Sequence, residues 1–117
     1  MHRIETVDGD SVTRPTTLAR SFMRRFVGLL ARRRLDAAEG LLLQPGGSIH
    51  TIGMRFAIDA VFLDADLVIL KVIAHVRPLR IALAPRKTHA VLEMSAGRAA
   101  ACALRPGMQL KLSEEKS

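Results

Sequence analysis

The chain of 117 residues has no tryptophan, no tyrosine and one cysteine, Cys102. A single cysteine cannot form an internal disulfide, so burial of apolar side chains must hold the fold together. Hydrophobic residues make up 49% of the chain, which argues against disorder and is enough for a core of aliphatic side chains and four phenylalanines. Cys102 lies in a small apolar segment, and we interpret it as a buried hydrophobe rather than a reactive thiol.

Long apolar runs are also absent. None approaches the ~20 residues that a helix needs to cross a bilayer. The first residues, Met1 to Val7, are charged and strand-like, which is unlike a secretory signal. We therefore expect a cytoplasmic protein. The length predicts one domain over residues 1–117, with a frayed tail at 113–117.

Acidic residues are fewer than basic ones. The 18 lysines and arginines outweigh 11 acidic residues, which gives a formal charge of +7. A basic balance favours anionic partners. The alternative explanation is that the Arg- and Ala-rich composition of the chain reflects the base bias of its genome and not a binding surface. Nucleic-acid binding usually also needs aromatic side chains that stack on bases, and aromatics are only 3% of this chain. Nucleic acid is therefore a weakly supported partner.

Familiar catalytic and cofactor motifs are missing. The four histidines form no His-Glu-x-x-His pattern, and no Cys-x-x-Cys is present, so no metal site is expected. The chain also lacks the Gly-x-Ser-x-Gly elbow of serine hydrolases and the Gly-Lys-Ser/Thr of phosphate loops. We expect no metal and no cofactor, and enzymatic activity stays undecided.

Two helices are predicted. Thr17 is a good N-cap, and the apolar residues after it recur at helical spacing, which favours a main helix over about 17–31. A second, short helix is expected over about 98–104. We expect both helices to pack on strands.

The rest of the chain favours strands and turns. Strands are expected at 2–7, 41–43, 55–63, 67–75, 88–94 and 108–112. The turn at Asp64 to Asp66 makes a hairpin of the two central strands, and residues 77–87, with four basic side chains, are expected to form an exposed loop. The predicted fold class is α+β, in which a mostly antiparallel, strongly curved sheet or small barrel packs the main helix.

A polar-in-apolar stretch stands at the centre of the chain. It reads His50-Thr51-x-x-Met54-Arg55-x-x-Ile58-Asp59-x-Val61-Phe62-Leu63-Asp64. Further stretches accompany it, namely Arg25-x-x-Gly28-Leu29, Gly40-Leu41-Leu42, Ala90-Val91-Leu92-Glu93 and Leu104-x-Pro106-Gly107. Together they resemble the domain of unknown function 192 family over about residues 12–112. The resemblance implies a small domain of mixed helix and mostly antiparallel strands, and it implies no reaction. Some members of the family carry secretion signals.

Strand geometry divides the central stretch into two faces. Phe56, Ile58, Ala60 and Phe62 fall on one face, which we expect to be core. Arg55 and Asp59 fall on the other face, four residues or ~13 Å apart, too far to pair with each other. Because a buried charge needs a partner, each must find one elsewhere.

Five residues are therefore candidates for a ligand-binding site: His50, Thr51, Arg55, Asp59 and Glu93. Each also has a structural interpretation. Asp59 is either a carboxylate that accepts backbone hydrogen bonds or a general base. Arg55 is either half of an ion pair or an anion clamp. His50 is either a structural histidine or an acid–base group.

The remaining two candidates are less specific. Thr51 is expected to hydrogen-bond to nearby backbone. Glu93 is expected to be exposed and becomes interesting if it proves close to Arg55 or His50.

Three functions remain open. The leading one is a binding or accessory module that holds an anionic small molecule or a group of a protein partner near His50, Arg55 and Asp59. The alternative is a small enzyme in which His50 and Asp59 share acid–base chemistry, which requires both side chains in one accessible cleft. The third is a basic module associated with nucleic acid or the ribosome.

Overall fold

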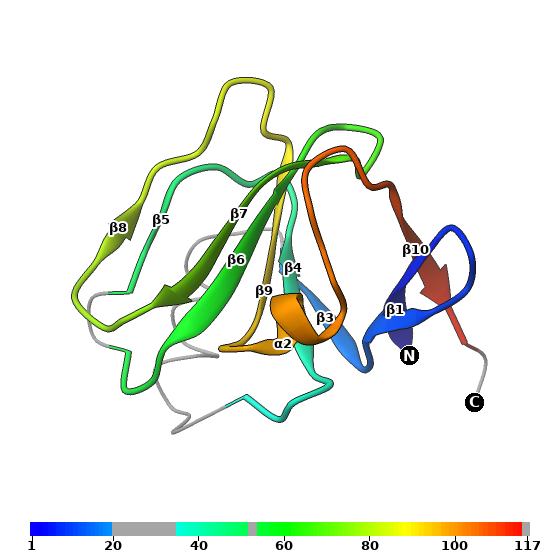
Figure 1. The fold of residues 1–117 in the computed structure, drawn as a ribbon, viewed down its shortest axis with the longest axis horizontal. Coiled ribbons are helices and arrows are strands. Elements are labelled where there is room, and N and C mark those ends of the chain that lie inside the picture. The colour runs from blue at the N-terminus through cyan, green and yellow to red at the C-terminus, as the bar shows by residue number, and fades with distance from the viewer. Residues whose placement is uncertain (20–34, 52–53, 116–117) are drawn as a thin grey trace.

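The fold is built from short strands and one turn of helix in a computed structural model, which describes residues 1–19, 35–51 and 54–115. The elements are β1 (His2–Thr6), β2 (Ser11–Thr13), β3 (Thr16–Ala19), β4 (Gly40–Leu43), β5 (Ile49–His50), β6 (Ile58–Leu63), β7 (Ile69–Val76), β8 (Ile81–Ala82), β9 (Ala90–Ser95), α2 (Arg98–Ala101) and β10 (Leu110–Glu114). They form a central sheet in the order β3-β4-β9-β6-β7, a second sheet β10-β1-β2 and a ribbon β5-β8 (Figure 1).

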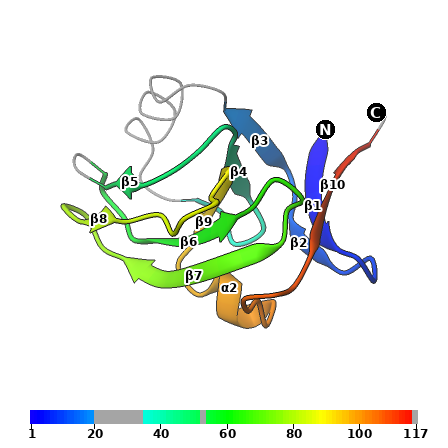
Figure 2. The same ribbon diagram turned by 90° about the horizontal axis from the view of Figure 1, so that it is seen from above.

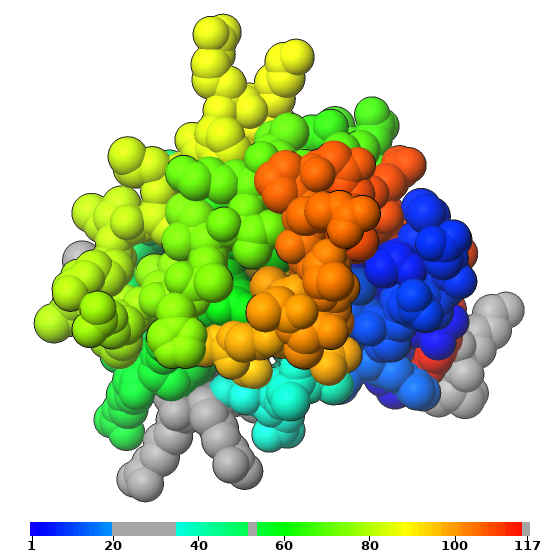
Figure 3. Space-filling model, viewed as in Figure 1, coloured from blue at the N-terminus to red at the C-terminus, as the bar shows by residue number. Residues whose placement is uncertain are grey.

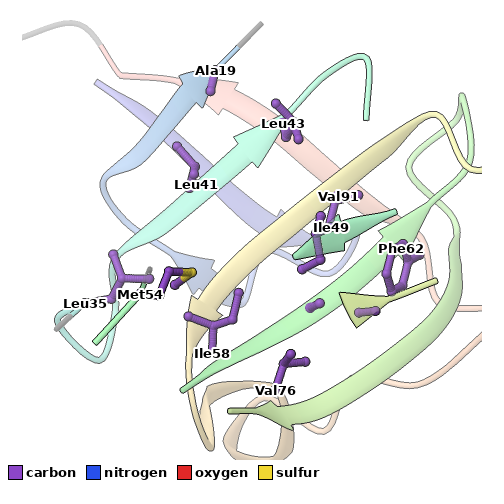
Figure 4. Close-up of a cluster of buried hydrophobic side chains, with 12 residues drawn as sticks. Ala19, Leu35, Leu41, Leu43, Ile49, Met54, Ile58, Phe62, Val76 and Val91 are labelled. Atoms are coloured by element: carbon purple, nitrogen blue, oxygen red, sulfur yellow. The ribbon is translucent and has the colours of Figure 1, made fainter. Parts of the chain in front are cut away.

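The inner strands of the central sheet, β4, β9 and β6, are buried on both faces. All six residues of β6 are buried, and its five apolar residues are divided between two apolar clusters on opposite faces. Ile58, Ala60 and Phe62 belong to the first cluster, which Figure 4 shows. Val61 and Leu63 belong to the second. A strand buried on both faces reads as a continuous apolar run, which explains the composition of this segment.

Different elements cover the two clusters. Ile49 of β5 and Ala82 of β8 belong to the first cluster. Ile4 of β1, Ala99 of α2 and Leu110 of β10 belong to the second. The ribbon β5-β8 and the sheet β10-β1-β2 therefore flank the central sheet, and α2 lies against it beside β7 (Figure 2).

The central hairpin is confirmed. β6 pairs antiparallel with β7, with Val61 opposite Val72, and the predicted core face of β6 lies in the first cluster. The predicted N-terminal strand and most of the other predicted strands are present within a few residues of the expected bounds. Among the strands that the structure describes, the pairing is antiparallel except between β3 and β4, which are parallel.

The α+β class and the barrel are corrected. The part of the chain that the structure describes is mainly β, with α2 as its one helix, and its strands form separate sheets instead of a closed barrel. The predicted helix over 17–31 is wrong at its start, because residues 17–19 belong to β3 and pair with Leu41 to Leu43 of β4. The rest of that prediction lies outside the described residues.

The predicted helix over 98–104 is also too long. Ala103 has a φ of 52°, a left-handed conformation that stops a helix. The amide of Leu104 donates to the carbonyl of Ala99 at 3.0 Å and that of Ala103 to Ala100 at 3.0 Å, the bond pattern of a Schellman cap. Helix α2 is therefore a single turn.

The predicted frayed tail is wrong for residues 113–115. β10 pairs with β1 through His2 and Glu114. Glu115 then receives hydrogen bonds from Arg3 and Arg14, each at 2.7 Å. These contacts fix the last described residues against the N-terminal strand.

A buried carboxylate between β1 and β10 gives a pH prediction. Hydrogen bonds from Ser113 and Lys111 hold the pKa of Glu5 below its ordinary value of 4.5. A depressed folded pKa contributes stability that is present above pH 4.5 and is lost as the pH falls through the folded value. We expect Glu5→Gln to lose less stability than the wild type between pH 7 and pH 3 in urea unfolding, because the variant has no carboxylate to protonate. Glu114→Gln, whose side chain is 70% exposed, should retain the wild-type response. Equal responses of Glu5→Gln and the wild type would contradict the assignment.

Candidate binding site

Asp59 is a buried anchor for three backbone amides. It is 0% exposed and lies on the β6 face that carries Val61 and Leu63. Its Oδ1 accepts a hydrogen bond from the amide of His75 at 2.9 Å. Its Oδ2 accepts from the amides of Gly97 and Ala99, each at 3.0 Å. One carboxylate thus ties β7 to the start of α2, and the predicted structural role of Asp59 is confirmed.

The bond to His75 fixes a bulge in β7. Opposite Ile58 and Ala60 of β6 lie Val76 and Ile73, so β7 holds one extra residue here. His75 has a φ of 58°, as bulge residues often do. Because a bulged residue leaves the hydrogen-bond ladder, its amide needs another acceptor, and Asp59 supplies it. Val76, directly after the bulge, still pairs with Ile58 and is the last residue of β7.

Thr51 holds that next segment. It is 0% exposed, and its Oγ1 donates to the carbonyl of Arg77 at 2.6 Å and accepts from the amide of Arg80 at 2.9 Å. The backbone of Thr51 adds a bond from its own amide to the Arg80 carbonyl at 2.8 Å and one from the Leu79 amide at 3.2 Å. Thr51 bonds to backbone as predicted, but the prediction of a nearby partner is wrong, because the backbone that its side chain bonds is 26 to 29 residues away along the chain.

Ser48 completes a set of three. Its Oγ accepts from the amide of Ala84 at 2.8 Å. Ser48, Thr51 and Asp59 therefore all bind the backbone of one stretch, residues 75–84, which we call the clamped segment. The central stretch of the sequence thus fixes the shape of a surface segment.

The clamped segment carries exposed apolar side chains at every second position. Leu79, Ile81 and Leu83 are 69%, 67% and 68% exposed. Arg77 and Arg80 are also exposed. Contiguous exposed apolar residues with charges beside them are typical of an interaction surface.

A groove of about 450 Å³ lies between β7 and the clamped segment. Figure 3 shows β7 and the segment after it side by side on one face of the molecule. The groove is lined by Lys71, Ile73, His75, Val76, Arg77, Arg80, Ile81, Ala82 and Leu83. Three of these side chains are cationic and none is acidic. The groove therefore combines apolar surface with positive charge.

A larger cavity of about 590 Å³ lies between the β1-β2 turn and the end of α2. Its lining includes Asp8 and Asp10 as well as Arg98 and Arg105. Because both signs of charge line it, it has no preference for an anion. The groove beside β7 is the better match to the basic composition of the chain.

The remaining candidates do not join Asp59. Arg55 is exposed in a bend before β6, and among the described residues it forms no ion pair, so the predicted pair is not found. The strand predicted from Arg55 begins at Ile58. His50 is half-buried on β5 opposite Ile81.

The predicted exposure of Glu93 is wrong. The sequence pattern predicts an exposed side chain, yet Glu93 is 0% exposed. Its cross-strand partners in the central sheet are Leu41 and Ala60, both of the first cluster. β9 is an inner strand of a sheet covered on both sides, so neither of its faces meets solvent.

The acid–base pair of the enzyme hypothesis is not assembled. Asp59 lies on the second-cluster side of the central sheet, and both of its oxygens accept backbone hydrogen bonds. His50 lies on the ribbon whose residues Ile49 and Ala82 pack into the first cluster, on the other side. The two side chains therefore do not meet in one accessible cleft. Within residues 1–19, 35–51 and 54–115, no group of three or more metal-binding side chains occurs.

Sequence reasoning does not single out the groove residues Lys71, Arg77 and Arg80. It predicts residues 77–87 as an exposed basic loop, and the exposure of most of this segment is confirmed. One signal is available in that loop. Leu79, Ile81 and Leu83 alternate with Arg80 and Ala82, which is a strand pattern in a stretch expected to face solvent.

The fold and the clamped segment define a small β-sheet domain of a class without an assigned reaction. The model of the domain of unknown function 192 family, described as an uncharacterized ACR, matches residues 3–112. The chain belongs to this family.

Two solved structures share the fold. A protein of unknown function from Novosphingobium aromaticivorans has a TM-score of 0.80 and 25% identity, and the match covers 94% of this chain and 82% of that one. A proposed transcription regulator from Sinorhizobium meliloti has a TM-score of 0.79 and 24% identity, with 94% and 90% covered. No curated protein matches the chain. Among the described residues, no helix is long and apolar enough to cross a membrane.

Proposed function

We propose that the protein is a binding module that presents the clamped segment to an anionic small molecule or to an anionic group of a protein partner. The observation that carries the proposal is the clamp itself. Two fully buried polar side chains, Thr51 and Asp59, are used to hold the backbone of an exposed segment. Burying polar groups is favourable only when their bonds are made, so their use on a surface segment implies that the shape of that segment matters.

The five candidate residues take different parts in this proposal. Thr51 and Asp59 position the segment and do not touch the ligand. Arg77 and Arg80 supply the charge, since guanidinium groups bind carboxylates and phosphates with two parallel hydrogen bonds. His50, beside Ile81, and the exposed Arg55 extend the binding surface at its margin. Glu93 is buried within the central sheet and does not contact the ligand.

Binding of simple anions tests the proposal. The chain has no tryptophan or tyrosine to report binding by fluorescence, so backbone amide resonances in NMR titrations with phosphate, citrate and acetate are the measurement. We expect shifts at residues 75–84 that weaken with added salt. The double variant Arg77→Ala/Arg80→Ala should weaken binding at least about tenfold, because hydrogen bonds to charged groups contribute ~1.5–3 kcal/mol each.

The matched control is Arg86→Ala/Lys87→Ala, which removes two exposed cations outside the groove and has the same net charge as the test variant. Its affinity should stay close to that of the wild type. Equal losses in both double variants would mean that net charge alone attracts the anion, and would contradict the proposal. Arg55→Ala tests the margin of the surface and should weaken binding less than Arg77→Ala.

A nucleic-acid module is the competing function, supported by the formal charge of +7. The similar structure from Sinorhizobium meliloti, a proposed transcription regulator, belongs to a protein of 24% identity and shares the fold alone. Duplex DNA and single-stranded RNA therefore enter the same titration. Tight binding with a steep salt dependence, spread over basic residues outside the clamped segment, would replace the proposed function.

A further inference from the structure

The groove has an apolar floor. Ile73, Val76 and Ala82 line it and also contact or belong to the first cluster. Val76 and Ala82 are 6% and 3% exposed, so the floor is continuous with the core. The groove is therefore the place where the first cluster opens to solvent between β7 and β8.

The rim of the groove is cationic. Lys71, Arg77 and Arg80 lie around it, and among the described residues no carboxylate lines it to neutralise them. The same groove is bordered by Ile81 and Leu83, which are 67% and 68% exposed. Large aliphatic side chains kept in water beside arginines are costly unless something covers them.

From this arrangement we infer that the natural ligand is an amphiphilic carboxylate, an anionic head on an unbranched apolar chain of medium length. The inference rests on the proposed function and names the ligand class of the same site. The head binds the Arg77 and Arg80 guanidinium groups, and the chain lies along Ile81 and Leu83 over the apolar floor. A volume of about 450 Å³ is within the ~300–1,000 Å³ usual for small-molecule sites.

The position of the bulge supports this arrangement. After the bulge at His75, Val76 still pairs with Ile58 of β6, and Thr51 then holds the backbone at Arg77 and Arg80. Asp59 and Thr51 thus shape the cavity although neither lines it.

The test is a homologous series of ligands. Acetate, hexanoate, octanoate and decanoate are titrated by NMR, each below the concentration at which it forms micelles, with 1-octanol as the neutral counterpart. We expect the affinity to rise about twofold to fourfold for each methylene group up to the length of the groove, as burial of a methylene predicts. Octanol should bind at least about tenfold more weakly than octanoate, because it lacks the charge that the arginines bind.

Two double variants distinguish contacts with the apolar chain of the ligand from contacts with its carboxylate. Ile81→Ser/Leu83→Ser should flatten the dependence on chain length and leave acetate binding unchanged. Arg77→Ala/Arg80→Ala should weaken every carboxylate and leave octanol unchanged. Leu79→Ser is the matched control, because Leu79 is 69% exposed on the same segment and does not line the groove. It should behave as the wild type.

The outcomes distinguish the inference from the proposed function. Equal affinity for all four carboxylates, with dependence on Arg77 and Arg80 retained, would overturn the inference and leave the proposed function intact. Binding of octanol as tight as that of octanoate would also overturn it. Binding of no anion at residues 75–84 would overturn both. Because all five substituted side chains are exposed, melting temperatures of the variants should stay near that of the wild type, which excludes unfolding as the cause of lost binding.

Discussion

Replacing Asp59 with alanine should lower the free energy of unfolding by about 3–5 kcal/mol, a large part of the stability of a domain of this size. The substitution removes one charged acceptor from three amides, those of His75, Gly97 and Ala99. A buried amide left without an acceptor, such as that of Ala99, costs ~1–3 kcal/mol, and the partly buried amides of His75 and Gly97 cost less. The costs are also not fully additive, because the three amides share one carboxylate. Urea unfolding followed by circular dichroism measures the loss.

Two further variants sharpen the test. Asp59→Asn retains one carbonyl oxygen and places an amide donor against amide donors, so we expect a loss of about 2–3 kcal/mol. Asp64→Ala is the matched control, because Asp64 also accepts two backbone amides, those of Asp66 and Val68, but does so in a partly exposed turn. Water can replace it there, and a loss of about 1 kcal/mol is expected. If Asp59→Ala cost no more than Asp64→Ala, the anchoring role would be contradicted.

Hydrogen exchange locates the effect. In Asp59→Asn the amides of Gly97 and Ala99 should exchange faster than in the wild type, together with that of His75. These amides lie 16 to 40 residues from Asp59 along the chain. Acceleration at such distant sites, with β1 and β10 unaffected, would show that the carboxylate acts as a local anchor for two segments and not through global loss of stability.

The features that the sequence predicted best are local. The apolar runs of β6 and β7 and the turn of Asp64 to Asp66 are contained in about 20 consecutive residues, so the hairpin could be predicted, and strand geometry then assigned the faces of β6. The spacing of Arg55 and Asp59 likewise excluded a mutual pair and required other partners. Because Asp59 needed a partner, the sequence left two interpretations, an acceptor of backbone hydrogen bonds or a general base, and the first is the one found.

The features that failed depend on distant partners. Residues 17–19 share a helical spacing with the apolar residues after them, but they pair in parallel with β4, more than 20 residues later. The alternation in β9 indicated an exposed Glu93 because it assumed one solvent face, and the inner position of β9 in a doubly covered sheet is a property of the whole fold. Tertiary pairing overrides local pattern in both cases.

The candidate site, too, was predictable only where its residues lie close together in the sequence. The sequence drew attention to His50, Thr51, Arg55 and Asp59 because polar residues interrupt an apolar run. Two of these, Thr51 and Asp59, act on a segment some 15 to 30 residues further on. No spacing rule connects a buried threonine with the carbonyl of Arg77. The surface that they shape could therefore be found only once the two parts of the chain were placed together.

Thr51→Val should be the second most damaging of these substitutions, with an expected loss of about 2–3 kcal/mol. Valine has nearly the shape of threonine, so the change removes the hydroxyl with little change in volume. The amide of Arg80 then loses its bond to Oγ1, and the carbonyl of Arg77 loses a bond of 2.6 Å. Thr51→Ser retains the hydroxyl and deletes one methyl group, for which about 1 kcal/mol is expected.

The comparison of valine with serine at position 51 also tests the link between the clamp and binding. In Thr51→Val the backbone at 77–80 is no longer fixed by the side chain, so Arg77 and Arg80 must be ordered when the anion binds, and the affinity for octanoate should fall about tenfold. Thr51→Ser should bind like the wild type at a temperature where both are folded. Equal affinity of the valine and serine variants would mean that the hydroxyl stabilises the fold alone. If only Thr51→Val loses affinity, the hydrogen bonds of the Thr51 hydroxyl are needed for binding, although Thr51 does not touch the ligand. The two variants allow this conclusion because Thr51→Ser retains the hydroxyl and Thr51→Val does not.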